Sequence, residues 1–202
     1  MKNLLHLLAF LLLFASCTQQ PQTRTSSNSV TTANVPQEQP QYPISASQQA
    51  FYTNLGKLCG KSFRGTTVFP ASDKDPFAGK ELTMHVTTCS DTTIRIPFHV
   101  GEDKSRTWVI RKMEEGLQLK HDHRHEDGTP DEVTMYGGVA LKTENASEAR
   151  FPADAFTAQL IPAAATNEWT LLLSPDGKTF SYILKRDNQL RFRADFDLTQ
   201  PL

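Results

Sequence analysis

Hydrophobic residues recur along the chain with two different periods, and the change of period separates a helix from a series of strands. In the segment 45–60 the apolar residues lie three or four positions apart, as on one face of a helix. A serine can cap this helix and a glycine can end it. The residues that define it are Ser45 or Ser47, Phe51, Leu55, Leu58 and Gly60.

After this helix, apolar and polar residues alternate, which is the pattern of strands with one buried face. The alternation is most regular between Leu190 and Leu198, where apolar residues are interleaved with two arginines and two aspartates. The same alternation covers residues 82–87, 93–100, 169–173 and 180–184. A second, short helix is predicted at Ala153–Leu160, directly after a Phe-Pro pair.

These elements predict a mainly β domain. We expect about eight or nine strands, joined by short polar turns and mostly as hairpins. Strands of this kind favour an antiparallel sheet closed into an up-and-down β-barrel, with one N-terminal helix and one short internal helix. A sandwich of two sheets is the alternative.

The first residues show a different pattern. Lys2 precedes a largely apolar run from Leu4 to Phe14, which is followed by Ala15 and Ser16. A run this short that ends in small residues is typical of a secretory signal peptide and not of a membrane-spanning helix. Residues 1–16 are therefore predicted to be removed.

The sequence LFASC at residues 13–17 resembles the cleavage box of bacterial lipoproteins, in which small residues directly precede a cysteine. The resemblance implies that Cys17 becomes the lipidated N-terminus and anchors the chain in a membrane. Several acyl chains would hold it firmly, because each buried methylene contributes about 0.8 kcal/mol. Thr18, in place of an aspartate, implies the outer membrane of a Gram-negative envelope.

Residues 17–44 are predicted to form a disordered tether behind this anchor. Gln, Thr, Ser, Asn and Pro dominate the segment, and it has almost no apolar side chain to bury. Such a composition does not offset the entropy cost of folding. The remaining residues, 45–202, are enough for one domain with its own core.

The charge and the cysteine content limit which partners the protein can bind and which cellular compartment it occupies. The chain has 21 Lys and Arg against 22 Asp and Glu, a formal net charge of −1. Because it has no basic excess, we expect no nucleic-acid partner. If Cys17 carries lipid, Cys59 and Cys89 remain, and an even pair in an oxidising envelope predicts one disulfide.

The segment LCGKSFRGTTVF at residues 58–69 resembles the entrance of lipocalin-like barrels, the calycins. In lipocalins a Gly-x-Trp motif opens the first strand, and an arginine of the last strand packs over the tryptophan. The resemblance places Phe63 in the position of the tryptophan and Arg191 or Arg193 in that of the arginine, and it implies a barrel that binds a small ligand. IPFHVG, LKHDHRHEDG and YGG are also similar to segments of a bacterial secreted family, which implies no activity.

Three of the six histidines stand at alternate positions in KHDHRHEDG, residues 120–128. His121, His123 and His125 are in phase with Leu117 and Leu119, so they are predicted to point into the barrel near its mouth. Imidazole binds zinc, copper, iron or nickel, and two neighbouring histidines of a strand are a common source of ligands.

The sequence leaves the rest of this site open. A third ligand would come from Glu132 or Tyr136 across the hairpin, or from His85 or His99, whose default is the outer surface. Asp122 is a candidate to orient a ligand. Two other interpretations use no metal: an exposed polar hairpin, or a buried network in which the histidines bond to Tyr136 and to carboxylates.

Three classes of function follow from these interpretations. We expect first a membrane-anchored envelope lipoprotein whose barrel binds a small molecule. The alternatives are a metal-dependent binding or hydrolytic site at the histidines, with a metal such as zinc, and a structural or interaction module. No phosphate-binding glycine loop, Gly-x-Ser-x-Gly motif or Cys-x-x-Cys motif indicates an enzyme.

Overall fold

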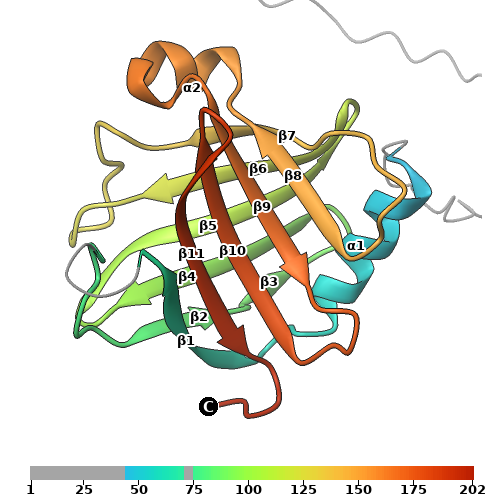
Figure 1. The fold of residues 1–202 in the computed structure, drawn as a ribbon, viewed down its shortest axis with the longest axis horizontal. Coiled ribbons are helices and arrows are strands. Elements are labelled where there is room, and N and C mark those ends of the chain that lie inside the picture. The colour runs from blue at the N-terminus through green and yellow to red at the C-terminus, as the bar shows by residue number, and fades with distance from the viewer. Residues whose placement is uncertain (1–43, 71–74) are drawn as a thin grey trace, which may run out of the picture. The chain divides into compact units, whose positions relative to one another are not determined.

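The computed structural model describes residues 44–70 and 75–202 and shows a mainly β, nearly closed antiparallel barrel (Figure 1). The fold class predicted from the alternation is therefore confirmed. The predicted signal peptide, Cys17 and all but the last residue of the predicted tether lie outside the described residues. Within the described ranges, no helix has the length and hydrophobicity needed to cross a membrane.

The strands follow one another around the barrel. Their bounds are β1 (Ser62–Phe69), β2 (Leu82–His85), β3 (Thr88–Cys89), β4 (Thr93–Val100), β5 (Asp103–Met113), β6 (Gly116–His123), β7 (Tyr136–Val139), β8 (Glu148–Pro152), β9 (Asn167–Leu173), β10 (Thr179–Arg186) and β11 (Gln189–Asp197). From β1 to β7 and from β8 to β11, each strand pairs with its neighbour in sequence, except that the two-residue β3 lies beside β4 and off this path. The first and last strands also pair, so the strands form one sheet and not a sandwich.

The barrel closes at a seam between β7 and β8. Here the backbone N–H of Leu141 donates to the carbonyl of Arg150 at 2.8 Å, and the N–H of Asp154 donates to the carbonyl of Gly137 at 2.9 Å. Both bonds fit a single antiparallel register. Gly138 lies between them, and a Cβ atom on it would stand 1.8 Å from the carbonyl oxygen of Pro152. The seam therefore needs a residue without a side chain at this position.

Helix α1 (Ala46–Gly56) covers the end of the barrel at which β6 begins, which we call the α1 end (Figure 1). The Ser45 side chain caps the helix by accepting from the N–H of Gln48 at 3.2 Å. Phe51 and Leu55 are fully buried beneath it. Gln48 is buried as well, and its Oε1 accepts from the N–H of Leu117 in β6 at 3.4 Å.

Helix α2 (Ala155–Leu160) lies beside β7 and is fixed to the seam through one threonine. The hydroxyl of Thr157 accepts from the N–H of Gly137 at 2.7 Å and donates to the carbonyl of the same residue at 2.8 Å. Asp154 caps the helix, and Lys120 of β6 donates to its carboxylate at 2.6 Å. The short internal helix is therefore confirmed, two residues shorter than its predicted range.

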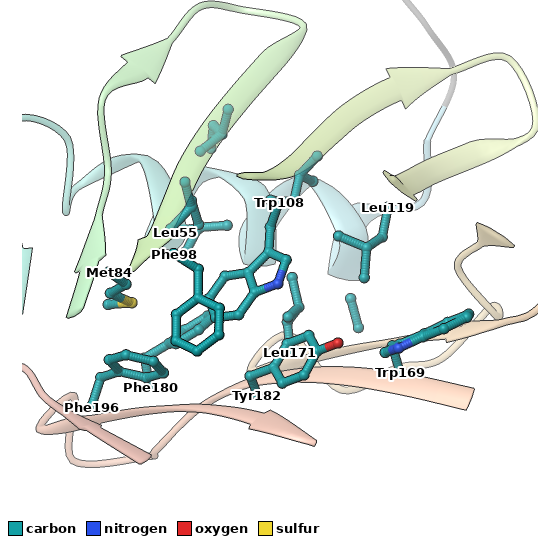
Figure 2. Close-up of a cluster of buried hydrophobic side chains, with 14 of the residues drawn as sticks. Leu55, Met84, Phe98, Trp108, Leu119, Trp169, Leu171, Phe180, Tyr182 and Phe196 are labelled. Carbon is teal, nitrogen blue, oxygen red and sulfur yellow. The ribbon is translucent and has the colours of Figure 1, made fainter. Parts of the chain in front are cut away.

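Aromatic side chains dominate the interior. Trp108 lies between Phe98 and Tyr182 in a row of stacked rings, with centroids 4.8 Å and 4.6 Å apart (Figure 2). All three are at least nine-tenths buried. Full burial of a large apolar side chain is worth roughly 1.5–3 kcal/mol, so this row contributes substantially to the stability of the barrel.

The predicted disulfide between Cys59 and Cys89 is present, with Cα atoms 6.1 Å apart. It joins the segment after α1 to β3, and it closes a chain segment of 30 residues. A loop of this length corresponds to a stabilisation of roughly 3–4 kcal/mol on the chain-entropy account. The bond therefore secures the α1 end of the barrel.

Candidate functional site

A cavity of about 290 Å³ lies inside the barrel, toward the end at which β6 finishes, which we call the open end. Six aromatic rings form most of its wall, four charged or imidazole side chains from three strands add polar groups, and Pro76, Thr107 and Leu184 complete it. The rings belong to Phe77, Phe98, Trp108, Tyr136, Tyr182 and Phe192, and the polar groups to Arg106, His121, His123 and Arg191.

The alternation of β6 brings two of the three predicted histidines into this cavity. Leu117 and Leu119 are fully buried in the core, and His121 and His123 follow in the same phase and line the cavity. His121 is 3% exposed, whereas His123 is half-buried nearer the open end. The strand thus changes along one face from an apolar core to a polar site.

Both ring nitrogens of His121 have hydrogen-bond partners. Nδ1 lies 3.2 Å from the carbonyl oxygen of Tyr136, and Nε2 lies 2.8 Å from the hydroxyl of Tyr182. Because a carbonyl only accepts, Nδ1 carries the proton in the neutral ring and donates it to Tyr136. Nε2 is then an acceptor, and the hydroxyl of Tyr182 donates to it. These contacts fix the tautomer and the orientation of the ring.

Tyr136 connects the two histidines. Its ring stacks on that of His121 with centroids 4.6 Å apart, and its hydroxyl lies 3.0 Å from Nε2 of His123. Trp169 packs against the His121 ring from β9, at a centroid distance of 5.0 Å. The predicted network of histidines with Tyr136 is therefore present, but the second hydroxyl comes from Tyr182 and no carboxylate takes part.

Burial makes this part of the cavity uncharged at neutral pH. It lowers the pKa of His121 to about 3, against the opposing effect of the hydrogen bond to Tyr136. Burial, and then the positive charge of Arg106, also lower the pKa of His123. In the other direction, burial raises the pKa of Tyr136 to about 12 and that of Tyr182 well above its ordinary value. The site therefore presents neutral donors and acceptors.

The other predicted site residues do not join the cavity. His125 lies in the exposed turn after β6, where its carbonyl accepts from the N–H of Gly128 at 2.9 Å. Glu132 is exposed in the connection to β7. Asp122 is buried on the outer face of β6, where Arg95 donates to it at 2.7 Å and Arg124 at 3.2 Å. It therefore orients neither histidine.

This arrangement does not favour a metal ion at the predicted histidines. Both nitrogens of His121 are engaged, and the strand ends at His123, so His125 does not turn inward. Nowhere in residues 44–70 and 75–202 do three or more His, Cys, Asp or Glu side chains gather closely enough to hold an ion. Metal binding by His121, His123 and His125 stays a prediction without support from the geometry.

Two arginines lie at the open end of the cavity. Arg106 donates to the carboxylate of Asp103 and stands over the ring of Phe77, 5.7 Å from its centroid. Arg191 is exposed and carries no ion pair within the described residues. Arg193 pairs instead with Asp195 at 2.8 Å, while Phe63 is buried in the core.

Sequence reasoning missed two residues that organise the site, Tyr182 and Trp169. The signal for Tyr182 was present, because it alternates in phase with Phe180 and Leu184 and so had to face inward. A buried tyrosine needs a partner for its hydroxyl, and His121 supplies it. Nothing in the sequence indicated which of the facing strands would bring that partner.

The fold and the cavity define a class of protein, an up-and-down β-barrel with a small aromatic internal site. Comparison with protein families, with curated proteins and with solved structures finds no match to this chain.

Proposed function

We propose that the barrel binds a small, planar, largely apolar molecule with one hydrogen-bonding end. The observation that carries this proposal is the aromatic cavity with neutral polar groups at its inner wall. At about 290 Å³ it is close to the lower end of the roughly 300–1,000 Å³ that ligand sites occupy. A ligand of one or two fused rings matches this size.

The chemistry of the walls supports a preferred orientation. Aromatic side chains form most of the cavity wall and suit a planar, apolar ligand, although the two faces of Trp108 are already covered by Phe98 and Tyr182. The Tyr182 hydroxyl retains acceptor capacity while it donates to His121, so it suits a ligand N–H or O–H. At the opposite end, Arg191 offers a positive charge to an anionic group, whereas the charge of Arg106 is offset by Asp103.

We also propose that the barrel is attached to the outer membrane of a Gram-negative envelope through lipid on Cys17. The support is the sequence LFASC together with the polar segment that follows it. The disulfide fits an oxidising envelope compartment. In this proposal the protein is a lipid-anchored binding protein and not an enzyme.

Calorimetric titration with 2-naphthol and 2-naphthoate tests the binding proposal. We expect at least one of the pair to bind the full chain with a dissociation constant below about 1 mM, a free energy of about 4 kcal/mol. Tighter binding of the carboxylate would indicate an anionic ligand held by Arg191. The variant Leu184→Trp replaces a leucine of the cavity wall by a bulkier indole ring, which fills part of the cavity and should weaken binding at least tenfold.

Ile183→Trp is the matched control, because Ile183 precedes Leu184 in β10 and faces the outer side of the barrel. It should leave the affinity within twofold of the unmodified protein. If neither naphthalene compound binds, or if both tryptophan variants bind as the unmodified protein does, the cavity is not a site for planar ligands of this size.

A further inference from the structure

Two more histidines meet on the outer face of the barrel, away from the cavity. His85 of β2 and His99 of β4 alternate with buried residues, so their side chains face outward. Nε2 of His85 lies 2.9 Å from Nδ1 of His99. Ser62 of β1 lies on the other side of the His85 ring, with its hydroxyl 2.7 Å from Nδ1. Three adjacent strands therefore supply a serine and two imidazoles in one line.

The geometry of the two rings differs from that of a straight hydrogen bond. A ring nitrogen lies about 1.1 Å from its ring centre, so a straight bond of this length would place the two centres about 5 Å apart. The centroids are only 4.3 Å apart, with the rings tilted by 49°. The nitrogens are therefore close together while their lone-pair directions are bent away from the line between them.

We propose that His85 and His99 form a surface site for a divalent transition metal, with Cu²⁺ as the ion it binds best. Two imidazole nitrogens about 2.0 Å from one ion, at a right angle, lie about 2.8 Å apart, which matches the observed separation. Cu²⁺ takes such square arrangements and heads the affinity order of the divalent ions. Water completes the coordination, since both rings border an open groove.

Metal binding requires that both imidazole rings be neutral and correctly oriented, and the residues around His85 and His99 favour both conditions. Burial, and then the charge of Lys104, lower the pKa of His85, and burial also lowers that of His99, so both rings are neutral at pH 7. In the tautomer that donates Nδ1–H of His85 to the Ser62 hydroxyl, 2.7 Å away, Nε2 is unprotonated and can bind the metal, as with other partners that orient metal-binding histidines. Lys104 opposes a bound cation, and we therefore expect micromolar and not tighter affinity.

A nucleophilic role for Ser62 is less consistent with the same geometry. Acyl transfer needs backbone N–H groups free to stabilise an oxyanion. Beside Ser62, the N–H of Gly60 donates to Val86 and that of Lys61 donates to Leu58, at 2.8 Å and 3.1 Å. The groove therefore offers imidazole ligands to an ion but no oxyanion site near the serine.

Titration of the untagged full chain with Cu²⁺, followed by calorimetry and by electron paramagnetic resonance, tests the proposal. We expect one equivalent to bind with hyperfine structure from two nitrogens. His85→Gln and His99→Gln should each weaken binding at least tenfold, and Ser62→Ala by roughly tenfold. Lys104→Met, at an exposed position, should strengthen binding several-fold, a change that loss of folding does not produce.

His125→Gln is the matched control, since it removes an exposed histidine from a different part of the surface. It should leave Cu²⁺ affinity and spectrum unchanged. The proposal is overturned if no Cu²⁺ binds more tightly than about 100 µM, roughly 5.5 kcal/mol. It is also overturned if His125→Gln weakens binding as much as His85→Gln, or if Lys104→Met has no effect.

Discussion

His121 shows how one buried side chain sets the chemistry of the cavity. Its ring is enclosed by Tyr136, Trp169 and Tyr182, and both nitrogens are hydrogen-bonded inside the barrel. In such surroundings the charged imidazolium is far less stable than the neutral ring. The folded protein therefore resists protonation at a residue that, in the unfolded chain, titrates near its ordinary pKa.

This resistance predicts a dependence of stability on pH. The pKa of His121 is about 3 in the folded protein, against an ordinary value of 6.5 for a solvated imidazole. Between these values the unfolded chain holds one more proton, so the free energy of unfolding falls as the pH falls, by about 1.4 kcal/mol per unit. The contribution is complete above pH 6.5. Urea unfolding between pH 7 and pH 5 measures the slope, and His121→Gln should make it shallower by about this amount.

His125→Gln is the comparison variant, because it removes a histidine from the exposed turn after β6 and leaves the buried ring of His121 in place. The comparison between variants is needed because the pKa values of His85, His99 and His123 are lowered too and act in the same direction. A His121→Gln variant with the unmodified slope would show that His121 is not buried in its neutral form.

At the scale of elements, the seam between β7 and β8 depends on glycine. Gly137 has a φ of +152°, and Gly138 leaves no room for a Cβ atom beside Pro152. The Tyr-Gly-Gly segment thus lets the chain before α2 approach β7, and Thr157 then binds the same glycine from the helix. Closure of the barrel and attachment of α2 therefore rest on the same two residues.

Gly138→Ala should accordingly be strongly destabilising. Its Cβ would lie 1.8 Å from the Pro152 carbonyl, so backbone must move apart and the seam hydrogen bonds must lengthen. We expect a loss of more than about 3 kcal/mol in urea unfolding, among the larger effects of single substitutions. Gly56→Ala is the control, since the nearest atom to its Cβ is 4.0 Å away and it lies in α1. There alanine should stabilise by up to about 1 kcal/mol.

Hydrophobic alternation accounts for most of what the sequence predicted at this scale. It located β2, β4, β9, β10, β11, both helices and the inward phase of β6. It did not locate β5, the longest strand, because Trp108, Val109 and Ile110 are consecutive apolar residues and break the alternation. The strand count of eight or nine was low: ten lie along the barrel path, and β3 is additional. The difference lies in short strands such as β3 and β7, which have too few residues to show a period.

The site was harder to predict than the fold, since it depends on which strands face each other. Alternation turned His121 and His123 inward, but the partners Tyr182 and Trp169 come from strands distant in sequence. His125 broke the pattern because β6 ends at His123 and the chain turns. The meeting of His85 and His99 likewise follows from strand register, which a single sequence does not fix.

At the scale of the whole molecule, the barrel and the proposed anchor use different cysteines among the three in the chain. Cys59 and Cys89 are paired with each other, so neither is available for lipid. Cys17 is the third cysteine of the chain and stands within the lipoprotein-like segment LFASC. The assignment of one cysteine to the membrane and two to the barrel is therefore internally consistent.

This assignment predicts the result of changing each cysteine in an expressing Gram-negative host. The unmodified protein should incorporate labelled palmitate, and mass spectrometry should find a mature chain that begins at an acylated Cys17. Cys17→Ala should abolish the label and leave residues 1–16 attached, because processing of lipoproteins requires the cysteine. The paired change of Cys59 and Cys89 to Ala should keep the label, although the barrel loses roughly 3–4 kcal/mol. Labelling that persists in Cys17→Ala, or an unmodified protein without acyl mass, would refute the anchor.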